Sequence, residues 1–164
     1  MSPVDETNNT VAPDDLSGRY LSFYIGDIIY SLPLNHVIEI IGIQNITHIP
    51  NVPHYIKGII NLRGKIVPIS DVRLKLGLEE RPYDDKTCIV IVLINDMNVG
   101  VIVDSVAEVV SLDRSNMAPP PASEKRMGDS YLDSISTVND KVIMNIDCVK
   151  FFQADTVVPF MQEE

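Results

Sequence analysis

The amino-acid sequence predicts a mainly β protein built from two similar five-stranded β-barrels in tandem, with a few short helices. Three observations support this prediction. Short runs rich in Val, Ile and Tyr recur at regular spacing, one half of the chain resembles the other, and a polar segment containing Pro82 separates the halves. Ten short strands in two similar sets fit two small barrels better than one long sandwich.

Each predicted strand is a short apolar run bounded by Gly, Asn or Asp. The first half holds five such runs, at 19–25, 28–32, 37–42, 55–62 and 65–70. The second half holds five more, at 87–95, 98–103, 107–112, 131–138 and 141–146. Gly26-Asp27 and Asn139-Asp140 are typical of tight hairpin turns. Short helices are expected at 71–76, where Asp71 is an N-cap type of residue, and at 147–152.

An internal repeat decides the predicted architecture. Residues 55–71 align without gaps on residues 131–147 at an offset of 76, and residues 37–41 resemble residues 106–110 at an offset of 69. Each half therefore carries the same order of strands.

We expect the first barrel at residues 19–80 and the second at residues 81–152, flanked by unstructured acidic tails at 1–18 and 153–164. The tails hold seven acids and no base, so the formal charge of −10 falls to −3 between residues 19 and 152. This balance disfavours bulk binding to nucleic acid or anionic membranes.

The compartment is predicted from absent signals and from cysteine usage. No secretion signal is visible, and no apolar run is long enough to cross a bilayer. Cys88 and Cys148 lie in strand-like apolar contexts, so we expect reduced core cysteines in a cytoplasmic protein, with a disulfide as the minor alternative.

Motifs for catalysis fail on spacing or on chemistry. Gly58 and Gly64 resemble a P-loop, but five residues separate them instead of four, and Ile66 stands where that motif needs Ser or Thr. There is no Gly-x-Ser-x-Gly motif, and the three histidines lack the spacing of a zinc site. We predict no catalytic residue, no metal and no cofactor. An enzyme whose carboxylates meet only in the folded chain stays open at this point.

Residues 57–76 carry five cations and one acid, a local net charge of +4. A patch of this kind suits an acidic surface on another protein. The alternative is a small β-barrel nucleic-acid-binding protein that uses the patch, although stacking aromatics are absent from it.

Arg63 lies at the tip of the hairpin formed by the 55–62 and 65–70 runs. A type II turn or a small bulged loop is expected there, because arginine is poorly suited to positive φ. The repeat places Asn139 at the equivalent turn, so the hairpin does not need a cation. Arg63 is therefore interpreted as an added contact for a partner, which suits its forked donors. Gly58 and Gly64 are explained by backbone geometry, and Leu62 and Ile66 are expected in the core.

Two segments, IKGIINLRGKIVPISDVRLKLG at 56–77 and VGVIVDSVAEVVSL at 99–112, resemble the CheW family of bacterial chemotaxis coupling proteins. The resemblance covers residues 20–152. It implies two five-stranded SH3-like barrels and a non-enzymatic adaptor. Such an adaptor joins the cytoplasmic tip of a methyl-accepting chemoreceptor to the regulatory domain of a CheA-type histidine kinase. The resemblance implies a cytoplasmic protein recruited to membrane-associated receptor arrays, without nucleic-acid binding and without direct membrane insertion.

The resemblance also implies site residues. Arg63 matches the partner-contact arginine of the family, and Val37 and Glu39 match residues at its receptor-binding surface. Together with Ile40 and with two lysines of the basic 57–76 segment, the predicted partner-binding residues are Val37, Glu39, Ile40, Lys57, Arg63 and Lys65.

Overall fold

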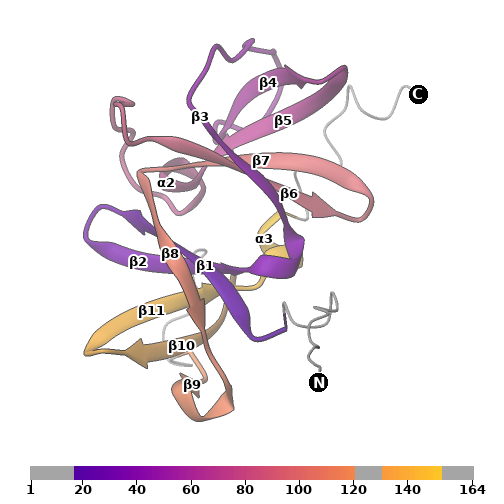
Figure 1. Ribbon diagram of the computed structural model, residues 1–164. Helices are drawn as coiled ribbons and strands as arrows, with labels where there is room; N and C mark the ends of the chain where they lie inside the picture. Colours follow the sequence, from indigo (N-terminus) through magenta and orange to yellow (C-terminus); the bar gives the residue numbers. More distant parts are fainter. Residues whose placement is uncertain (1–16, 121–130, 153–164) are drawn as a thin grey trace.

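The computed structural model describes residues 17–120 and 131–152, and it places two β-sheets one above the other with short helices between them (Figure 1). The upper sheet has the strand order β3-β6-β7-β5-β4, and the lower sheet has the order β8-β1-β2-β11-β10-β9. In chain order the elements are β1 (Arg19–Ile25), β2 (Ile28–Pro33), the 3-10 helix η2 (Leu34–His36), β3 (Val37–Gly42), β4 (Ile56–Leu62), β5 (Lys65–Asp71), α2 (Val72–Lys75), β6 (Cys88–Ile94), β7 (Met97–Val103), β8 (Ser105–Ser111), the 3-10 helix η3 (Arg114–Asn116), β9 (Met117–Ala118), β10 (Leu132–Val138), β11 (Lys141–Ile146) and α3 (Cys148–Phe152).

The prediction of a mainly β fold is confirmed, and each of the ten predicted strands is present with ends shifted by no more than two residues. The Asp71 side chain caps α2 by accepting a hydrogen bond from the Arg73 N–H at 2.8 Å. The two-residue strand β9 and both 3-10 helices were not predicted. Within the described residues no ladder joins the outer strands of either sheet, so the expected barrels are not closed by hydrogen bonds. The predicted tails lie almost wholly outside the described residues.

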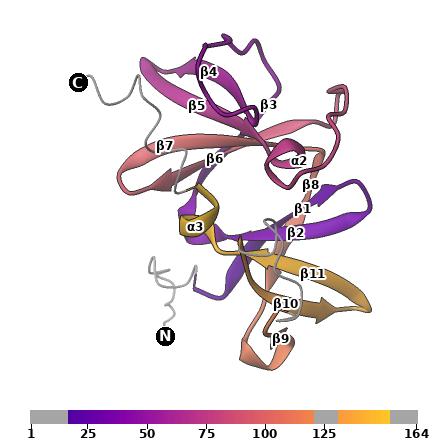
Figure 2. The ribbon, with the colours of Figure 1, turned by 180° about the vertical axis from the view of Figure 1, so that it is seen from behind.

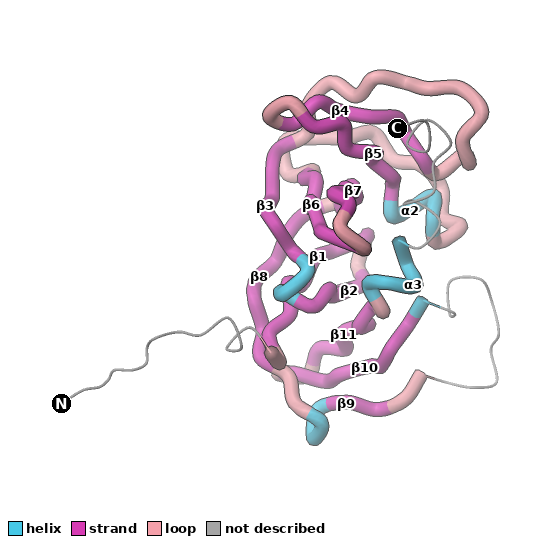
Figure 3. Tube along the Cα trace, turned by 90° about the vertical axis from the view of Figure 1, so that its right-hand side faces the viewer, coloured by secondary structure: helices cyan, strands magenta, loops and turns pink. Residues whose placement is uncertain are grey.

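Each sheet takes strands from both halves of the chain. The β6–β7 hairpin of the second half lies between β3 and β5 of the first half, and the β1–β2 hairpin lies between β8 and β11 of the second half. Figure 3 shows this interleaving from the side. The two sheets therefore do not correspond to residues 19–80 and 81–152, the predicted barrels.

Each half thus contributes one hairpin to a sheet of the other half, and we call this arrangement the exchange. Two parallel junctions complete it, β5 beside β7 and β2 beside β11, and the repeat makes these junctions equivalent. At the first junction Ile69 faces Gly100, and a Cβ atom at Gly100 would lie 2.6 Å from Cδ1 of Ile69. At the second junction the equivalent residues are Asn145 and Ser31, and the Ser31 hydroxyl donates to Oδ1 of Asn145 at 2.6 Å. One junction is thus a steric fit and the other a hydrogen bond.

The polar junction extends into a buried network. The Asn145 amide donates to the hydroxyls of Ser134 and Ser136 at 2.9 and 2.8 Å. Asn145 and Ser136 are at most 1% exposed, and the residue equivalent to Ser136 in the other sheet is Ile60. Buried amides and hydroxyls stabilise a fold only when they are paired.

The chemistry of the two junctions explains the exchange. If each half folded alone, β2 would lie beside β5 and Ser31 would face Ile69. The Ser31 hydroxyl would then lose its acceptor against an apolar side chain that leaves no room for a Cβ atom in the native junction. Asn145 would face Gly100 and lose its donor. The exchanged pairing is the one that satisfies both junctions.

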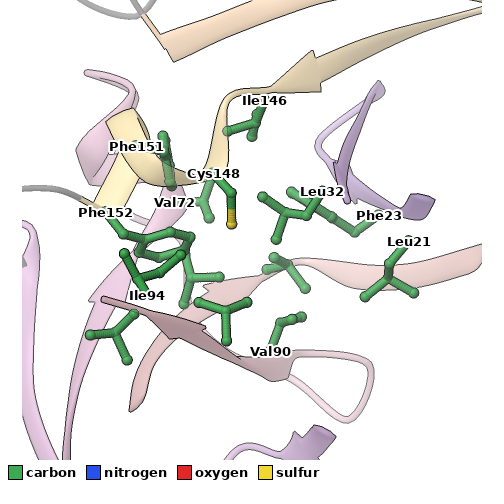
Figure 4. Packing of buried hydrophobic residues seen from close by; sticks show 14 of the residues in the cluster. Leu21, Phe23, Leu32, Val72, Val90, Ile94, Ile146, Cys148, Phe151 and Phe152 are labelled. Atoms are coloured by element: carbon green, nitrogen blue, oxygen red, sulfur yellow. The ribbon is translucent and has the colours of Figure 1, made fainter. Parts of the chain in front are cut away.

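The largest core cluster lies where the two sheets meet (Figure 4). It combines residues of both sheets with residues of α2 and α3, which Figure 2 shows between the sheets. Its members include Leu21, Phe23, Leu32, Val72, Val90, Ile94, Ile146, Cys148, Phe151 and Phe152. Because each sheet contains strands of both halves and the two sheets share a core, we expect them to unfold as one unit.

A charged cluster fastens α2 and the β1–β2 turn to the end of β7. Asp104 accepts hydrogen bonds from the Gly26 N–H at 2.7 Å, from Arg73 Nη2 at 2.7 Å and from Arg81 Nη1 at 2.9 Å. Burial opposes ionisation of this carboxyl, but the hydrogen bonds from Arg73 and Gly26 outweigh it and lower the pKa of Asp104 below its ordinary value.

Replacing Asn145 tests the polar junction. Asn145→Ile leaves three buried hydroxyls without their partner, and we expect the free energy of unfolding to fall by about 3 kcal/mol. Adding Ser31→Gly recreates the steric junction, so the double variant should lose less stability than the sum of its two single changes. Urea unfolding of the four proteins measures the coupling. Strictly additive losses would contradict the junction argument.

Replacing Asp104 tests the charged cluster. Asp104→Asn should lower the free energy of unfolding at pH 7 by about 2 kcal/mol, since it weakens charge-assisted hydrogen bonds. The folded-state pKa is lowered, so this contribution is present above the ordinary carboxyl pKa and is lost as pH falls through the folded value. The difference between wild type and variant should shrink below about pH 4. An equal difference in urea unfolding at pH 7 and pH 3 would rule out the ionic contribution.

Candidate partner-binding site

The β4–β5 hairpin turns at Arg63 and Gly64, where φ is +53° and +87°. Leu62 pairs with Lys65 directly across the turn. A two-residue loop with positive φ at both positions is a type I′ turn, whose twist matches that of the paired strands. The expectation of a type II turn or bulged loop is wrong, because the twist of the hairpin selects the turn even though arginine fills its first position.

Two other hairpins show what this turn ordinarily contains. Asn95-Asp96 and Asn139-Asp140 have the same backbone, with φ of +52° and +66° in one and +52° and +67° in the other. Asn and Asp tolerate this region, whereas an arginine there costs about 1 kcal/mol. The backbone alone therefore favours Asn at position 63, and the presence of Arg63 needs another reason.

Arg63 forms an ion pair with Glu39 on β3, in which Nη2 of Arg63 donates to Oε1 of Glu39. Strands β3 and β4 are the outer strands of the five-stranded sheet, so the pair spans the open side of that sheet. The side chains stay 67% and 28% exposed, respectively. An exposed pair contributes at most about 1 kcal/mol, and the guanidinium retains donors for a carboxylate on another protein. The equivalent residues of the other sheet, Asn139 and Glu108, cannot form such an ion pair.

Gly58 holds the segment before β4 in place. Its φ is +146°, and a Cβ atom there would lie 2.1 Å from the carbonyl oxygen of Thr47. Thr47 and Ile59 exchange two backbone hydrogen bonds of 2.9 Å at this point. Any side chain at Gly58 would push this segment away from the strand that carries Arg63. Gly64 has open space around it and is required only by its positive φ.

Strand β3 presents two faces next to the ion pair. Val37 packs against the core cluster between the sheets, and Ile41 packs against a smaller core cluster formed within the five-stranded sheet, so this face is half-buried. Ile38 and Ile40 point the other way and are 45% and 41% exposed. Of the predicted partner-binding residues on β3, Ile40 lies on the open face and Val37 is packed inside. Ile38 was not among the predicted partner-binding residues, and it lies on the same exposed face as Ile40, as strand alternation requires.

The predicted cationic surface over residues 57–76 is taken up by contacts within the fold. Lys57 pairs with Glu80, Arg63 with Glu39, and Arg73 with Asp104. Lys75 is 4% exposed, with its Nζ atom 4.6 to 5.0 Å from the centroids of three aromatic rings. In the described part of the chain, the structure gives Lys65 no acidic partner. Most of the positive charge of this segment is therefore already engaged within the fold.

Exposed apolar side chains lie at the far tips of the hairpins. Ile66 is 50% exposed and its repeat equivalent Val142 is 51% exposed, so the prediction that Ile66 belongs to the core is wrong. Both follow a hairpin turn by one residue, where the strand extends beyond the core. In the six-stranded sheet Val142 borders an open hollow lined by Tyr24, Asp27, Ile28, Ile29, Lys141, Val142 and Met144.

The cysteines and the potential metal-ligating side chains of the described residues bear on whether the protein holds a reactive or metal-binding arrangement. Cys88 and Cys148 are free, and burial raises the pKa of the Cys148 thiol to about 12, so it is a poor nucleophile. No group of three or more metal-ligating side chains occurs among residues 17–120 and 131–152. In the same part of the chain, no helix has the length and apolar character needed to cross a membrane.

Comparison with known proteins agrees with this arrangement. The family described as CheW-like domain matches residues 19–156. The chain is 30% identical to the chemotaxis protein CheW of Klebsiella aerogenes over 149 residues, which cover 91% of this chain and 90% of that protein. It is 30% identical to the chemotaxis protein CheW of Bacillus subtilis over 129 residues, with coverage of 79% and 83%.

A solved structure shares the fold. The crystal structure of the scaffolding protein CheW from Thermoanaerobacter tengcongensis matches with a TM-score of 0.77 and 33% sequence identity, over 83% of this chain and 92% of that one. The family match spans all the described strands. With the interleaved sheets and the hairpin that carries Arg63, these similarities lead to one conclusion: this chain belongs to the CheW-like domain family.

Proposed function

We propose that this chain is a non-enzymatic chemotaxis adaptor that couples methyl-accepting chemoreceptors to a CheA-type histidine kinase. Membership of the CheW-like family supports this. The adaptor works in the cytoplasm and is recruited to membrane-associated receptor arrays through its partners. No step of bond making is required, because coupling needs only simultaneous binding of two proteins.

The observation that carries the proposal is the arginine in the left-handed turn. A residue held in an unfavourable backbone conformation points to a functional role, and the equivalent turns use Asn. Arg63 and Glu39 form the proposed contact surface, in which Glu39 orients the guanidinium, while the exposed Ile38 and Ile40 lie on the opposite face of β3. A partner that offers a carboxylate to the exposed guanidinium fits this surface.

The two ends of the molecule support a coupler with more than one partner. The Ile66 tip of the five-stranded sheet and the Val142 tip of the six-stranded sheet each expose an apolar side chain beside a lysine, Lys65 and Lys141. We propose that a barrel end of this kind packs on a homologous domain of the kinase. Apolar burial at such an end supplies affinity, and the lysine supplies orientation.

Exchanging the turn residues tests the Arg63 contact. Arg63→Asn recreates the turn of the other half, so the melting temperature should stay equal or rise, while binding to receptor-bearing membranes and kinase should fall about tenfold or more. Asn139→Arg is the matched control, and it should leave binding unchanged. Co-sedimentation with membranes and kinase measures the binding of both variants, and thermal unfolding measures their melting temperatures. Full assembly by Arg63→Asn would refute the assignment of the contact.

Polar substitutions at the tips test the kinase contacts. Ile66→Ser and Val142→Ser should each weaken binding to the isolated kinase regulatory domain by about tenfold, since each removes apolar burial. Val149→Ser on α3 removes a similarly exposed side chain, and it should bind like wild type. Titration calorimetry measures the three affinities. Equal losses in all three variants would mean that the tips have no special part in docking.

A further inference from the structure

The turn that carries Arg63 has a side-chain contact outside its own two residues. Oδ1 of Asn61 accepts a hydrogen bond from the Gly64 N–H at 2.9 Å. Asn61 lies on β4, paired with Ile66 of β5, so the strand ladder fixes its backbone. The contact therefore ties the middle of the turn to a rigid element.

The position of this hydrogen bond matters more than its strength. Turn types I′ and II′ share a positive φ at the first turn residue, and they differ in the orientation of the peptide that joins the two turn residues. In this hairpin that peptide carries the Gly64 N–H. A type II′ turn would rotate the N–H away from Asn61, so the hydrogen bond selects the type I′ form that Arg63 and Gly64 adopt.

The repeat shows that the hairpin itself does not need this contact. The residue equivalent to Asn61 is Thr137, and in the described part of the chain the structure gives no hydrogen bond from Thr137 to the turn that follows it. That turn contains Asn139 and Asp140, residue types that tolerate positive φ without help. Asn61 therefore accompanies Arg63, the residue that tolerates this conformation least.

We propose that Asn61 is a positioning residue for Arg63. By holding the Arg63–Gly64 peptide in the type I′ orientation, Asn61 directs the guanidinium across the open side of the sheet toward Glu39. A partner's carboxylate then meets an arginine whose direction is already set, so less conformational freedom is lost on binding. This inference rests on the proposed role of Arg63 as a partner contact.

The first measurement concerns the turn and needs no partner. In the full-length protein, Asn61→Ala should make the Gly64 amide exchange with solvent about fivefold faster, the loss expected for one hydrogen bond. Asn61→Asp keeps an acceptor oxygen and should restore slow exchange. Thr137→Ala is the matched control, and the Asp140 amide should not change. Unchanged Gly64 exchange in Asn61→Ala overturns the positioning role, whatever the binding results.

The second measurement concerns binding. Asn61→Ala should weaken co-sedimentation with receptor-bearing membranes and kinase about fivefold in the wild-type background. In the Arg63→Asn background the same substitution should have no further effect, because no arginine remains to be positioned. An equal loss in both backgrounds overturns the proposal, since it would mark Asn61 as a contact in its own right.

These measurements separate the two ideas. If Arg63→Asn alone binds like wild type, the contact role of Arg63 fails, and the Gly64 amide still decides whether Asn61 holds the turn. If Arg63→Asn loses binding while Asn61→Ala keeps both slow exchange and full affinity, the contact role stands and the positioning role falls.

Discussion

Two parallel strand junctions, β5 beside β7 and β2 beside β11, hold a hairpin from each half of the chain inside a sheet built by the other half. Everything else in the architecture follows from them. They place both sheets against one shared core, and they bring α2 and α3 together between the sheets. Ile69 over Gly100 and Asn145 with Ser31 are chemically different solutions to the same geometric problem. This difference favours the native pairing of each hairpin with the strands of the other half.

The proposed contact surface depends on the first of these junctions. Arg63 and Glu39 both belong to the first half of the chain, but their strands are separated in the sheet by β6 and β7 of the second half. The ion pair forms only because that hairpin is inserted between them and the sheet curls until its outer strands approach. The ion pair between Arg63 and Glu39 can therefore form only when the two halves of the chain are paired. This relation gives a physical reason for placing a partner contact there.

Local patterns predicted the strands, the helix cap at Asp71 and the hairpin that turns at Arg63, because alternation, turn residues and repeats are encoded within a few residues. They did not predict the exchange, since the same repeat fits strands that pair within a half or between halves. They also overestimated the free charge at 57–76. Lys57 and Arg63 find their acids 23 and 24 residues away, a separation that no local pattern reveals. Ile66 was predicted to lie in the core because it belongs to an apolar run. The sequence pattern near a hairpin turn does not show whether the strand extends past the core, and Ile66 is exposed.

The interleaved sheets make the two halves behave like the subunits of an obligate heterodimer that happen to be joined by a linker at 77–87. Each half completes the sheets of the other, so neither half can form its complete sheets alone. The polar junction and the steric junction disfavour the alternative pairings, in which a polar position would face an apolar or empty one. Both halves are therefore needed together for the fold to form. The outer surfaces of the two sheets can differ, provided that the β5–β7 and β2–β11 junctions keep their pairing.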